Sequence, residues 1–251
     1  KYNNLEKLRF KIKLDSGYCL DINNIKPYIF YAGACDPRKN LRNLLRAYSN
    51  LSLDLLLKYK LVLAGKLFES EKELINRWIK EFNLNKKNII LLGYVSDTDL
   101  AILYRNCELF VFPSLHEGFG LPVLEAMSCG APSIGSNRTS IPEVIGSSEA
   151  LFDPECITQI TQLIEKALTD TSFKDFLISN SRQQRQNFSW KITSDKSMEA
   201  FREIVDNYSS QIIYNDWDTI KEKTSHFSSN IIDDLINDKV LRKHSNTDLI
   251  N

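Results

Sequence analysis

Two acids, Glu117 and Glu125, flank a short glycine-containing loop near the middle of the sequence. Gly118 and Gly120 stand on either side of an aromatic residue, and Pro122 follows at a position typical of the first turn of a helix. Such a loop lets the backbone approach a ligand closely, and the free N–H groups of the next helix attract an anion. Carboxylates beside them suit sugar hydroxyls. The alternative is a pair of capped acids that face the solvent.

A second group of charged residues lies in the loop after residues 28–32. Arg38 and Lys39 are adjacent cations just before an expected helix. A cation about 4 Å from a phosphate charge is worth at most about 4 kcal/mol at an effective dielectric constant of 20, so the pair could hold a diphosphate. Taken alone, the pair is better explained as solvated charges at a helix start, which is usual for Lys and Arg. Its convergence with the glycine loop at one edge of the fold favours the phosphate site.

The other candidates for chemistry disfavour metal and redox mechanisms. The three histidines are far apart in the sequence and we expect no paired-aspartate D-x-D motif, which together favour a metal-independent reaction. The run Gly118-Phe119-Gly120 is not the dinucleotide fingerprint G-x-G-x-x-G and follows the fourth expected strand instead of the first, so an oxidoreductase is disfavoured. His116 could touch a ligand, but a hydrogen-bonded structural role fits it better.

Composition places the chain among ordinary globular proteins. Its 251 residues are 43% hydrophobic and 25% charged, and 32 basic residues balance 32 acidic ones, so no global positive field favours nucleic acid or an anionic membrane. Five scattered cysteines without a C-x-x-C pair predict reduced thiols. We recognise no signal peptide and no apolar run near the roughly 20 residues of a membrane helix. Because the first residue is Lys1, we expect a further portion upstream.

The elements that must position these residues alternate between strands and helices. The expected strands are 28–32, 61–65, 88–92, 109–112 and 133–135, and the expected helices include 69–82, 97–105, 157–168, 173–187 and 192–208. Near-continuous apolar strands alternating with helices indicate a parallel sheet covered on both faces. Ligands bind beyond the carboxyl ends of such strands. We therefore expect an α/β fold, a Rossmann-like parallel sheet with helices on both faces, followed by carboxy-terminal helices.

Three motifs together carry a family resemblance. They are Glu117-Gly118-Phe119-Gly120-Leu121-Pro122 with Glu125, Pro37-Arg38-Lys39-Asn40, and Ile141-Pro142-Glu143-Val144. They closely resemble the carboxy-terminal, donor-binding domain of retaining GT-B glycosyltransferases, and more narrowly of glycosyltransferase family four, which includes bacterial mannosyltransferases. The resemblance covers about residues 27–208 and implies one half of a GT-B fold.

The resemblance also implies roles for individual residues. The second acid of the family's motif, here Glu125, holds the donor ribose, and the first, Glu117, contacts the transferred sugar and stabilises it without attacking it. Many members carry an arginine where this chain has Ala34, so charge neutralisation is expected to rest on Arg38 and Lys39 alone. The resemblance assigns catalysis to Glu117, Lys39 and Arg38, and donor binding to Gly33, Tyr94, Val95, Gly118, Phe119, Gly120, Leu121 and Glu125.

The implied reaction is the retaining transfer of a hexose, mannose being favoured, from a nucleoside diphosphate sugar to a growing glycan in polysaccharide biosynthesis. GDP-mannose is the favoured donor, and neither a cofactor nor a metal is expected. The expected partners are a glycan or lipid-linked glycan acceptor and an amino-terminal acceptor domain of the same chain, without nucleic acid. The expected location is cytoplasmic, at the inner face of the membrane, with peripheral association through parts outside these residues.

Two alternatives stay open. The chain could be a non-catalytic nucleotide-sugar-binding module of a larger multi-domain glycan polymerase, because binding requires the same groups. It could also be a GT-B-fold sugar epimerase, which would isomerise the donor without an acceptor. The expected domain boundaries are a lead-in segment or interdomain linker over 1–26, the Rossmann-like nucleotide-sugar-binding domain over 27–188, a carboxy-terminal helix over 189–210, and a polar helical tail or linker over 211–251.

Overall fold

The computed structural model describes residues 11–13, 17 and 19–211. The chain divides into two compact units, Lys1–Phe188 and Ser189–Asn251. The first unit holds the sheet and its helices, and the described part of the second is a single long helix, α9 (Trp190–Gln211). Apart from its first residue, the tail expected over 211–251 lies outside the described residues.

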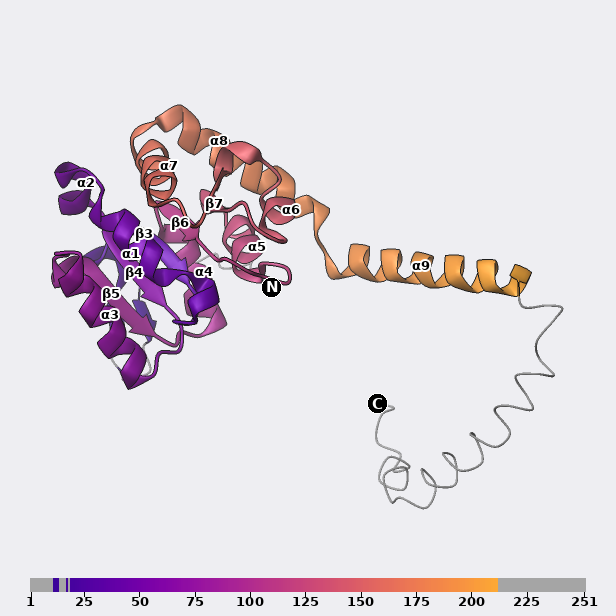
Figure 1. Cartoon of the computed structure of the whole chain (residues 1–251), viewed down its shortest axis with the longest axis horizontal. Coiled ribbons are helices and arrows are strands. Elements are labelled where there is room, and N and C mark those ends of the chain that lie inside the picture. Colours follow the sequence, from indigo (N-terminus) through magenta and orange to yellow (C-terminus); the bar gives the residue numbers. More distant parts are fainter. Residues whose placement is uncertain (1–10, 14–16, 18, 212–251) are drawn as a thin grey trace, which may run out of the picture. The chain divides into compact units, whose positions relative to one another are not determined.

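Six parallel strands form the central sheet of the first unit (Figure 1). In spatial order they are β5 (Ile89–Gly93), β4 (Lys60–Ala64), β3 (Tyr28–Ala32), β6 (Leu109–Phe112), β7 (Ser133–Ser136) and β8 (Leu151–Phe152). Within this sheet the chain first forms the central strand β3 and then β4 and β5 toward one edge. It then returns to the other side of β3 to form β6. The order of strands therefore reverses between β3 and β6, which is where α/β sheets open a crevice for ligands.

In the described part of this unit, eight α-helices connect and cover the strands, so the expected α/β fold with helices on both faces is confirmed (Figure 1). They are α1 (Leu41–Ser49), α2 (Leu53–Lys58), α3 (Glu69–Glu81), α4 (Asp97–Asn106), α5 (Leu121–Ser128), α6 (Ile141–Ile145), α7 (Ile157–Thr169) and α8 (Thr171–Gln184). Helix α1 contacts α3 and α7, whereas α5 contacts α4, α6 and α8. Side-chain caps fix several starts: Ser96 accepts from the Asp99 N–H before α4, and Asp170 accepts from the Phe173 N–H before α8.

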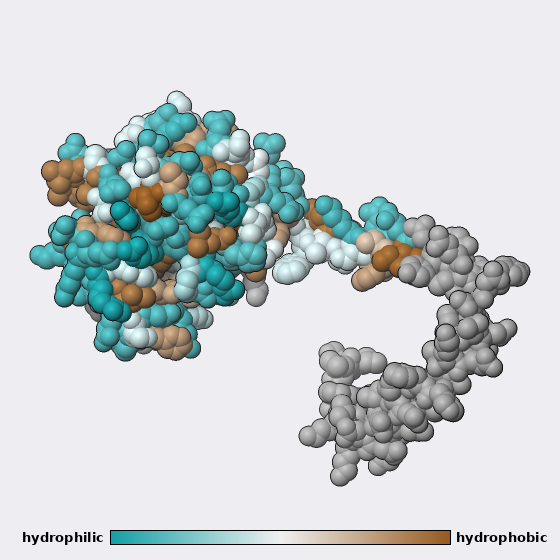
Figure 2. All heavy atoms as spheres, viewed as in Figure 1, coloured by the Kyte–Doolittle hydropathy of each residue, from teal (hydrophilic) through white to brown (hydrophobic). Residues whose placement is uncertain are grey.

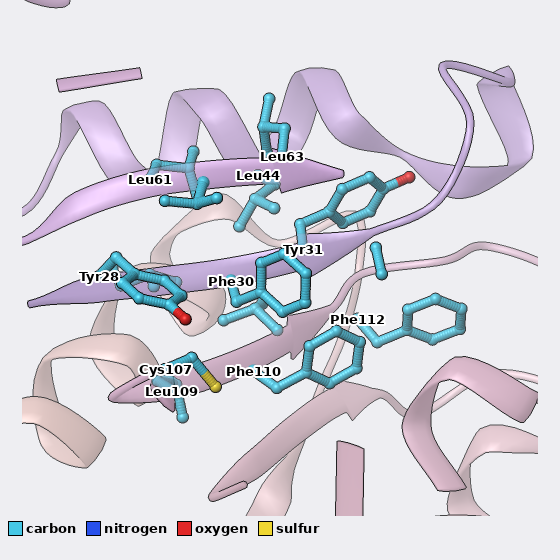
Figure 3. Packing of buried hydrophobic residues seen from close by; sticks show 14 of the residues in the cluster. Tyr28, Phe30, Tyr31, Leu44, Leu61, Leu63, Cys107, Leu109, Phe110 and Phe112 are labelled. Atoms are coloured by element: carbon cyan, nitrogen blue, oxygen red, sulfur yellow. The ribbon is translucent and has the colours of Figure 1, made fainter. Parts of the chain in front are cut away.

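Aromatic side chains of the two central strands, among them Phe30 and Phe110, pack in the core (Figure 3). Phe30 of β3 and Phe110 of β6 both pack edge-on against Tyr104 of α4, with ring centroids 5.3 and 5.2 Å away. Such contacts add about 0.5–1.5 kcal/mol beyond the area that they bury. The buried hydroxyl of Tyr28 donates to the Leu103 carbonyl at 2.7 Å, so this polar group has a hydrogen-bond partner inside the core.

The described residues before Pro27 pack on the same unit. Strands β1 (Lys11–Lys13) and β2 (Cys19–Asp21) form a small antiparallel sheet. Ile12, Ile22 and Ile25 are buried with the main core.

The surface in view in Figure 2 is mostly polar, with apolar residues scattered over it. Among the described residues, the helices are too short or too polar to cross a membrane.

Gly65, directly after β4, shows how closely the strand ends approach one another. Its φ is +154°, and a Cβ there would lie 2.0 Å from the Gly33 carbonyl oxygen. We expect Gly65→Ala to lower the free energy of unfolding by about 3 kcal/mol or more, because a backbone atom blocks the added methyl group. Urea unfolding of the chain would measure it. Gly118→Ala is the matched control, because a Cβ at Gly118 meets nothing within 4 Å, and equal losses in the two variants would contradict this interpretation.

Candidate functional site

The candidate site lies at the reversal of strand order, between the loops that follow β3 and β6. The first loop runs from Gly33 to the short 3-10 turn Pro37–Lys39, and the second contains Glu117 and the two glycines. The two loops are in direct contact, because the Leu115 N–H donates to the Arg38 carbonyl at 2.7 Å. The hydroxyl of Tyr31, at the end of β3, donates to the Ala34 carbonyl at 2.9 Å and lies close to Gly33.

Lys39 and Glu117 form an ion pair across these loops. The Lys39 Nζ donates to the Glu117 Oε1 at 2.6 Å, and the two side chains are only 24% and 13% exposed. The Lys39 ammonium also lies 5.6 Å from the ring centroid of Phe112, the last residue of β6. The next residue, Asn40, ends this turn in a left-handed conformation. Its side-chain amide donates to the Pro113 and Pro154 carbonyls at 3.0 and 2.7 Å and so holds the turn in place. A cation and an acid predicted from separate motifs therefore meet.

The side chain of Arg38 is paired with Asp36 and not with Glu117. Its guanidinium binds the Asp36 carboxylate through two hydrogen bonds, 3.0 Å from Nε and 2.9 Å from Nη2, and its side chain is 68% exposed. These bonds lower the pKa of Asp36 to about 2. Asp36 also accepts from the Arg38 N–H at 2.8 Å, so the pair belongs to the local turn. The structure brings Lys39 to Glu117, whereas the side chain of its neighbour Arg38 is held by Asp36.

The glycine loop leads directly into α5. Gly120 is the N-cap residue at φ +100°, a left-handed conformation that favours glycine, and a Cβ there would lie 2.6 Å from the Ile141 Cδ1. Phe119 packs edge-on against Phe188 at 5.5 Å between ring centroids, while the neighbouring Gly118 is open and exposed. Leu121, the first residue of α5, is half exposed. Gly118 and Leu121 are thus exposed in the loop that follows Glu117, whereas Gly120 is buried.

Glu125 lies on α5, partly buried against α4. The hydroxyl of Tyr104 donates to its Oε2 at 3.2 Å. Burial raises the pKa of the Glu125 carboxyl, the Tyr104 hydrogen bond works against that rise, and the negative charge of Asp97 adds to it. With one carboxylate oxygen occupied by a buried tyrosine, the other can accept hydrogen bonds from a ligand.

The remaining predicted donor-binding residues follow β5 and β3 at the same edge of the sheet. Tyr94 is 53% exposed after Gly93, and Val95 is buried. Gly33 follows β3 and its N–H donates to the Ala64 carbonyl at 2.9 Å. Because β4 separates β5 from β3, Tyr94 and Val95 lie two strands away from the strand that leads to Lys39.

Possible metal ligands do not gather in the described residues. The expectation that the sequence lacks a D-x-D pair is wrong, because the sequence contains two. One, Asp216 and Asp218, lies outside the described residues, and the other is Asp97 and Asp99. Both residues lie in the first turn of α4, where the Ser96 hydroxyl donates to the Asp99 carboxylate at 2.9 Å. Over the described part of the chain, no group of three or more His, Cys, Asp or Glu side chains is placed to hold a metal ion.

Sequence reasoning missed four side chains that hold the predicted ones in place. They are Asn40, which follows Lys39 and holds its turn, Tyr104, which donates a hydrogen bond to Glu125, and Thr139 and Ser140, which form hydrogen bonds with the backbone of Glu117. Asn40 belongs to the quoted Pro37–Asn40 motif, so its position carried a signal. The other three act across distances of 21 to 23 residues, for which no spacing rule exists.

Comparison with known proteins gives concordant similarities. A sequence profile described as "Glycosyl transferases group 1" matches residues 20–184. The chain is 44% identical over 178 residues to the serotype-specific mannosyltransferase WbdA of Escherichia coli, and 38% identical over 175 residues to the O-antigen chain mannosyltransferase B of that species. Among solved structures, sucrose-phosphate synthase from Thermosynechococcus elongatus superposes with a TM-score of 0.62 at 26% identity over 72% of this chain and 46% of that one.

The matches cover much of this chain but only part of each relative. The alignment with WbdA takes in 71% of this chain and 22% of that protein, and the alignment with mannosyltransferase B takes in 70% and 45%. The chain thus spans about a fifth to a half of the length of these curated relatives, all of which are larger.

Proposed function

We propose, from the premise that this chain belongs to the group 1 glycosyl transferases, that it is the donor-binding half of a retaining hexosyltransferase. The donor is a nucleoside diphosphate sugar, with GDP-mannose favoured, and the acceptor is a growing glycan in polysaccharide biosynthesis. Support for mannose comes from the names of the two Escherichia coli relatives. An amino-terminal domain of the same protein carries the acceptor, and the greater length of the relatives leaves room for it.

The observation that carries this proposal is the contact between Lys39 and Glu117 at the reversal of strand order. A cation there can neutralise a diphosphate, while an acid next to it can accept hydrogen bonds from the sugar on that diphosphate. Gly118 and Leu121 are exposed in the loop that follows Glu117, and Glu125 can bind ribose through its second oxygen. These groups match the three parts of a nucleoside diphosphate sugar: ribose, diphosphate and hexose.

The proposed reaction breaks the bond between the anomeric carbon and the phosphate oxygen and forms one to an acceptor hydroxyl on the same face of the sugar. The proton of that hydroxyl passes to the departing phosphate oxygen, so no protein nucleophile is needed. Lys39 stabilises the negative charge that develops on the diphosphate, and Glu117 holds and orients the sugar. The stabilisation is differential, because the charge of the leaving group grows as the bond breaks.

Isothermal titration of the chain against GDP, GDP-mannose, UDP and UDP-glucose tests the proposal. We expect binding of a nucleoside diphosphate, with additional affinity from the attached sugar and a preference for the guanine nucleotides. If none of the four binds, the donor-binding function is wrong. If the UDP compounds bind better, the proposed donor is wrong while the function stands.

The partners and location follow from the same proposal. We place the protein in the cytoplasm at the inner face of the membrane, where a lipid-linked glycan acceptor is available, with any membrane contact made by parts outside these residues.

The Tyr104 hydroxyl offers a direct test of the role of Glu125. We expect Tyr104→Phe to weaken donor binding about 3- to 10-fold, which corresponds to one hydrogen bond of about 1 kcal/mol. That hydroxyl lowers the pKa of Glu125, so its loss raises the pKa further and leaves more of the carboxyl protonated at mildly acidic pH. The loss of affinity should therefore be larger at about pH 5.5 than at about pH 8. Titration at both pH values would measure it.

Two controls make this prediction specific. The phenylalanine ring keeps the packing against Phe30 and Phe110, so the thermal midpoint should change little. Binding of 2′,3′-dideoxy-GDP, which lacks both ribose hydroxyls, should be the same in wild type and variant. An equal loss with this analogue would mean that Tyr104 does not act through the ribose contact.

A further inference from the structure

The peptide of Glu117 is held on both sides by one turn. The turn lies between β7 and α6, and two of its hydroxyls face the second loop of the site. The Glu117 N–H donates to the Thr139 Oγ1 at 3.1 Å, and the Ser140 Oγ donates to the Glu117 carbonyl at 3.1 Å. Both backbone polar groups of this one residue are therefore bound to neighbouring side chains of the turn. Its carboxylate meets Lys39 at 2.6 Å.

Thr139 takes a conformation that threonine rarely adopts. Its φ is +52°, in the left-handed region, where a β-branched residue is strained by about 1–2 kcal/mol. Glycine would take this conformation without strain, but it has no hydroxyl to accept from Glu117. Strain of this kind persists only where surrounding contacts require it. The contact that Thr139 makes here is the hydrogen bond to the Glu117 N–H.

The turn that carries these hydroxyls is itself held by hydrogen bonds to β8 and to the residues that follow it. The Asn137 N–H donates to the Phe152 carbonyl of β8 at 2.8 Å, and the Arg138 guanidinium reaches Asp153 and Glu155 at 3.1 Å each. Ile141, the first residue of α6, is completely buried. Hydroxyls on a turn held in this way can fix the position of the Glu117 peptide.

Phe119 and Gly120 are packed against Phe188 and Ile141, but Gly118, directly after Glu117, is not. A Cβ at Gly118 would meet nothing within 4 Å, so the residue next to Glu117 is not confined by packing. Rotation of the Glu117 peptide would move its carboxylate relative to Lys39 and to the sugar. The two hydroxyls of the turn oppose such a rotation.

We propose that Thr139 and Ser140 are positioning residues, which hold the Glu117 peptide so that its carboxylate contacts the sugar of the donor. The inference rests on the proposed function, because it takes Glu117 as the group that binds the transferred hexose. The two residues act through Glu117 and not on the nucleotide. Their loss should therefore reduce the affinity that the sugar adds, and leave the affinity for the nucleoside diphosphate.

The experiment compares GDP with GDP-mannose in titrations of the wild-type chain and the double variant Thr139→Val with Ser140→Ala. Valine has the shape and the backbone strain of threonine but no hydroxyl. We expect GDP-mannose binding to weaken about 10-fold while GDP binding stays within about 2-fold, since each tenfold corresponds to about 1.4 kcal/mol. Thr139→Ser with Ser140→Thr keeps both hydroxyls and should restore the sugar's contribution. If the two hydroxyl-free substitutions leave the ratio of GDP to GDP-mannose affinity unchanged, or weaken both ligands equally, the inference is wrong.

Thr139→Gly provides a second, independent readout. Glycine relieves the strain at φ +52°, so the variant should unfold at the same or a higher urea concentration while losing part of the sugar's contribution. A role in folding alone would instead link the loss of sugar affinity to a loss of stability. Failure of the proposed function is recognised separately, because wild type would then show no added affinity for the sugar, or Glu117→Ala would retain it in full.

Discussion

Replacing Lys39 by methionine is expected to weaken GDP binding about 100-fold and to reduce transfer by at least as much. Methionine keeps the length of the side chain but removes its charge. A cation about 4 Å from a phosphate is worth at most about 4 kcal/mol at an effective dielectric constant of 20. Part of that energy offsets the loss of the pair with Glu117 when phosphate takes its place. The remainder, about 2.7 kcal/mol, corresponds to the expected 100-fold change.

The neighbouring residue supplies the matched control. Arg38→Met removes the same charge one position away, from a side chain that is 68% exposed and already paired with Asp36. Solvent and salt screen an exposed charge of this kind, so we expect less than about a 5-fold loss. Titration with GDP and with guanosine separates the effects, because binding of guanosine should be unchanged in both variants. Equal losses of GDP affinity in the two variants would mean that the diphosphate lies between both cations and not against Lys39.

Most of the sheet could be predicted from the sequence because its strands are buried on both faces. Runs such as Tyr28–Ala32 and Leu109–Phe112 are apolar throughout, and each is fully buried in the structure. Strand β8 and helix α6 were missed, since two and five residues are too short to show a period. Their structure depends on β7, with which β8 pairs and against which α6 packs.

The meeting of Lys39 with Glu117 was predictable for a different reason. The two residues are 78 positions apart, but each follows a strand of a parallel sheet, and such loops open at the same edge. The rule places loops and not side chains, so it could not tell Lys39 from Arg38. That distinction depends on the local turn in which Asp36 accepts from the backbone and the guanidinium of Arg38. The roles of Tyr104, Thr139 and Ser140 depend on tertiary distances alone.

Replacing Glu117 by glutamine is expected to affect binding and transfer in opposite directions. In the enzyme that contains both the donor and the acceptor domain, we expect transfer to fall about 100-fold, because the amide lacks the charge that stabilises the sugar as the bond to phosphate breaks. GDP binding should become tighter, by up to about 3-fold, because Lys39 no longer has to leave a carboxylate at 2.6 Å. A general loss of folding would weaken both, so the opposite signs identify the local effect. Glu149→Gln, at an exposed acid of the 3-10 turn Ser148–Ala150, should change neither quantity.

The same variant separates the enzyme from a binding module. If the chain were a non-catalytic nucleotide-sugar-binding part of a larger glycan polymerase, glycan synthesis by the complete protein would continue undiminished in Glu117→Gln while donor binding changed. A GT-B-fold epimerase would differ again, because wild type would convert the donor sugar in the absence of any acceptor. Transfer, GDP binding and donor isomerisation are each measured on the wild-type protein and on the Glu117→Gln variant. The catalytic assignment holds only if transfer falls while GDP binding is kept, because Glu117 then contributes to the transition state and not to holding the nucleotide.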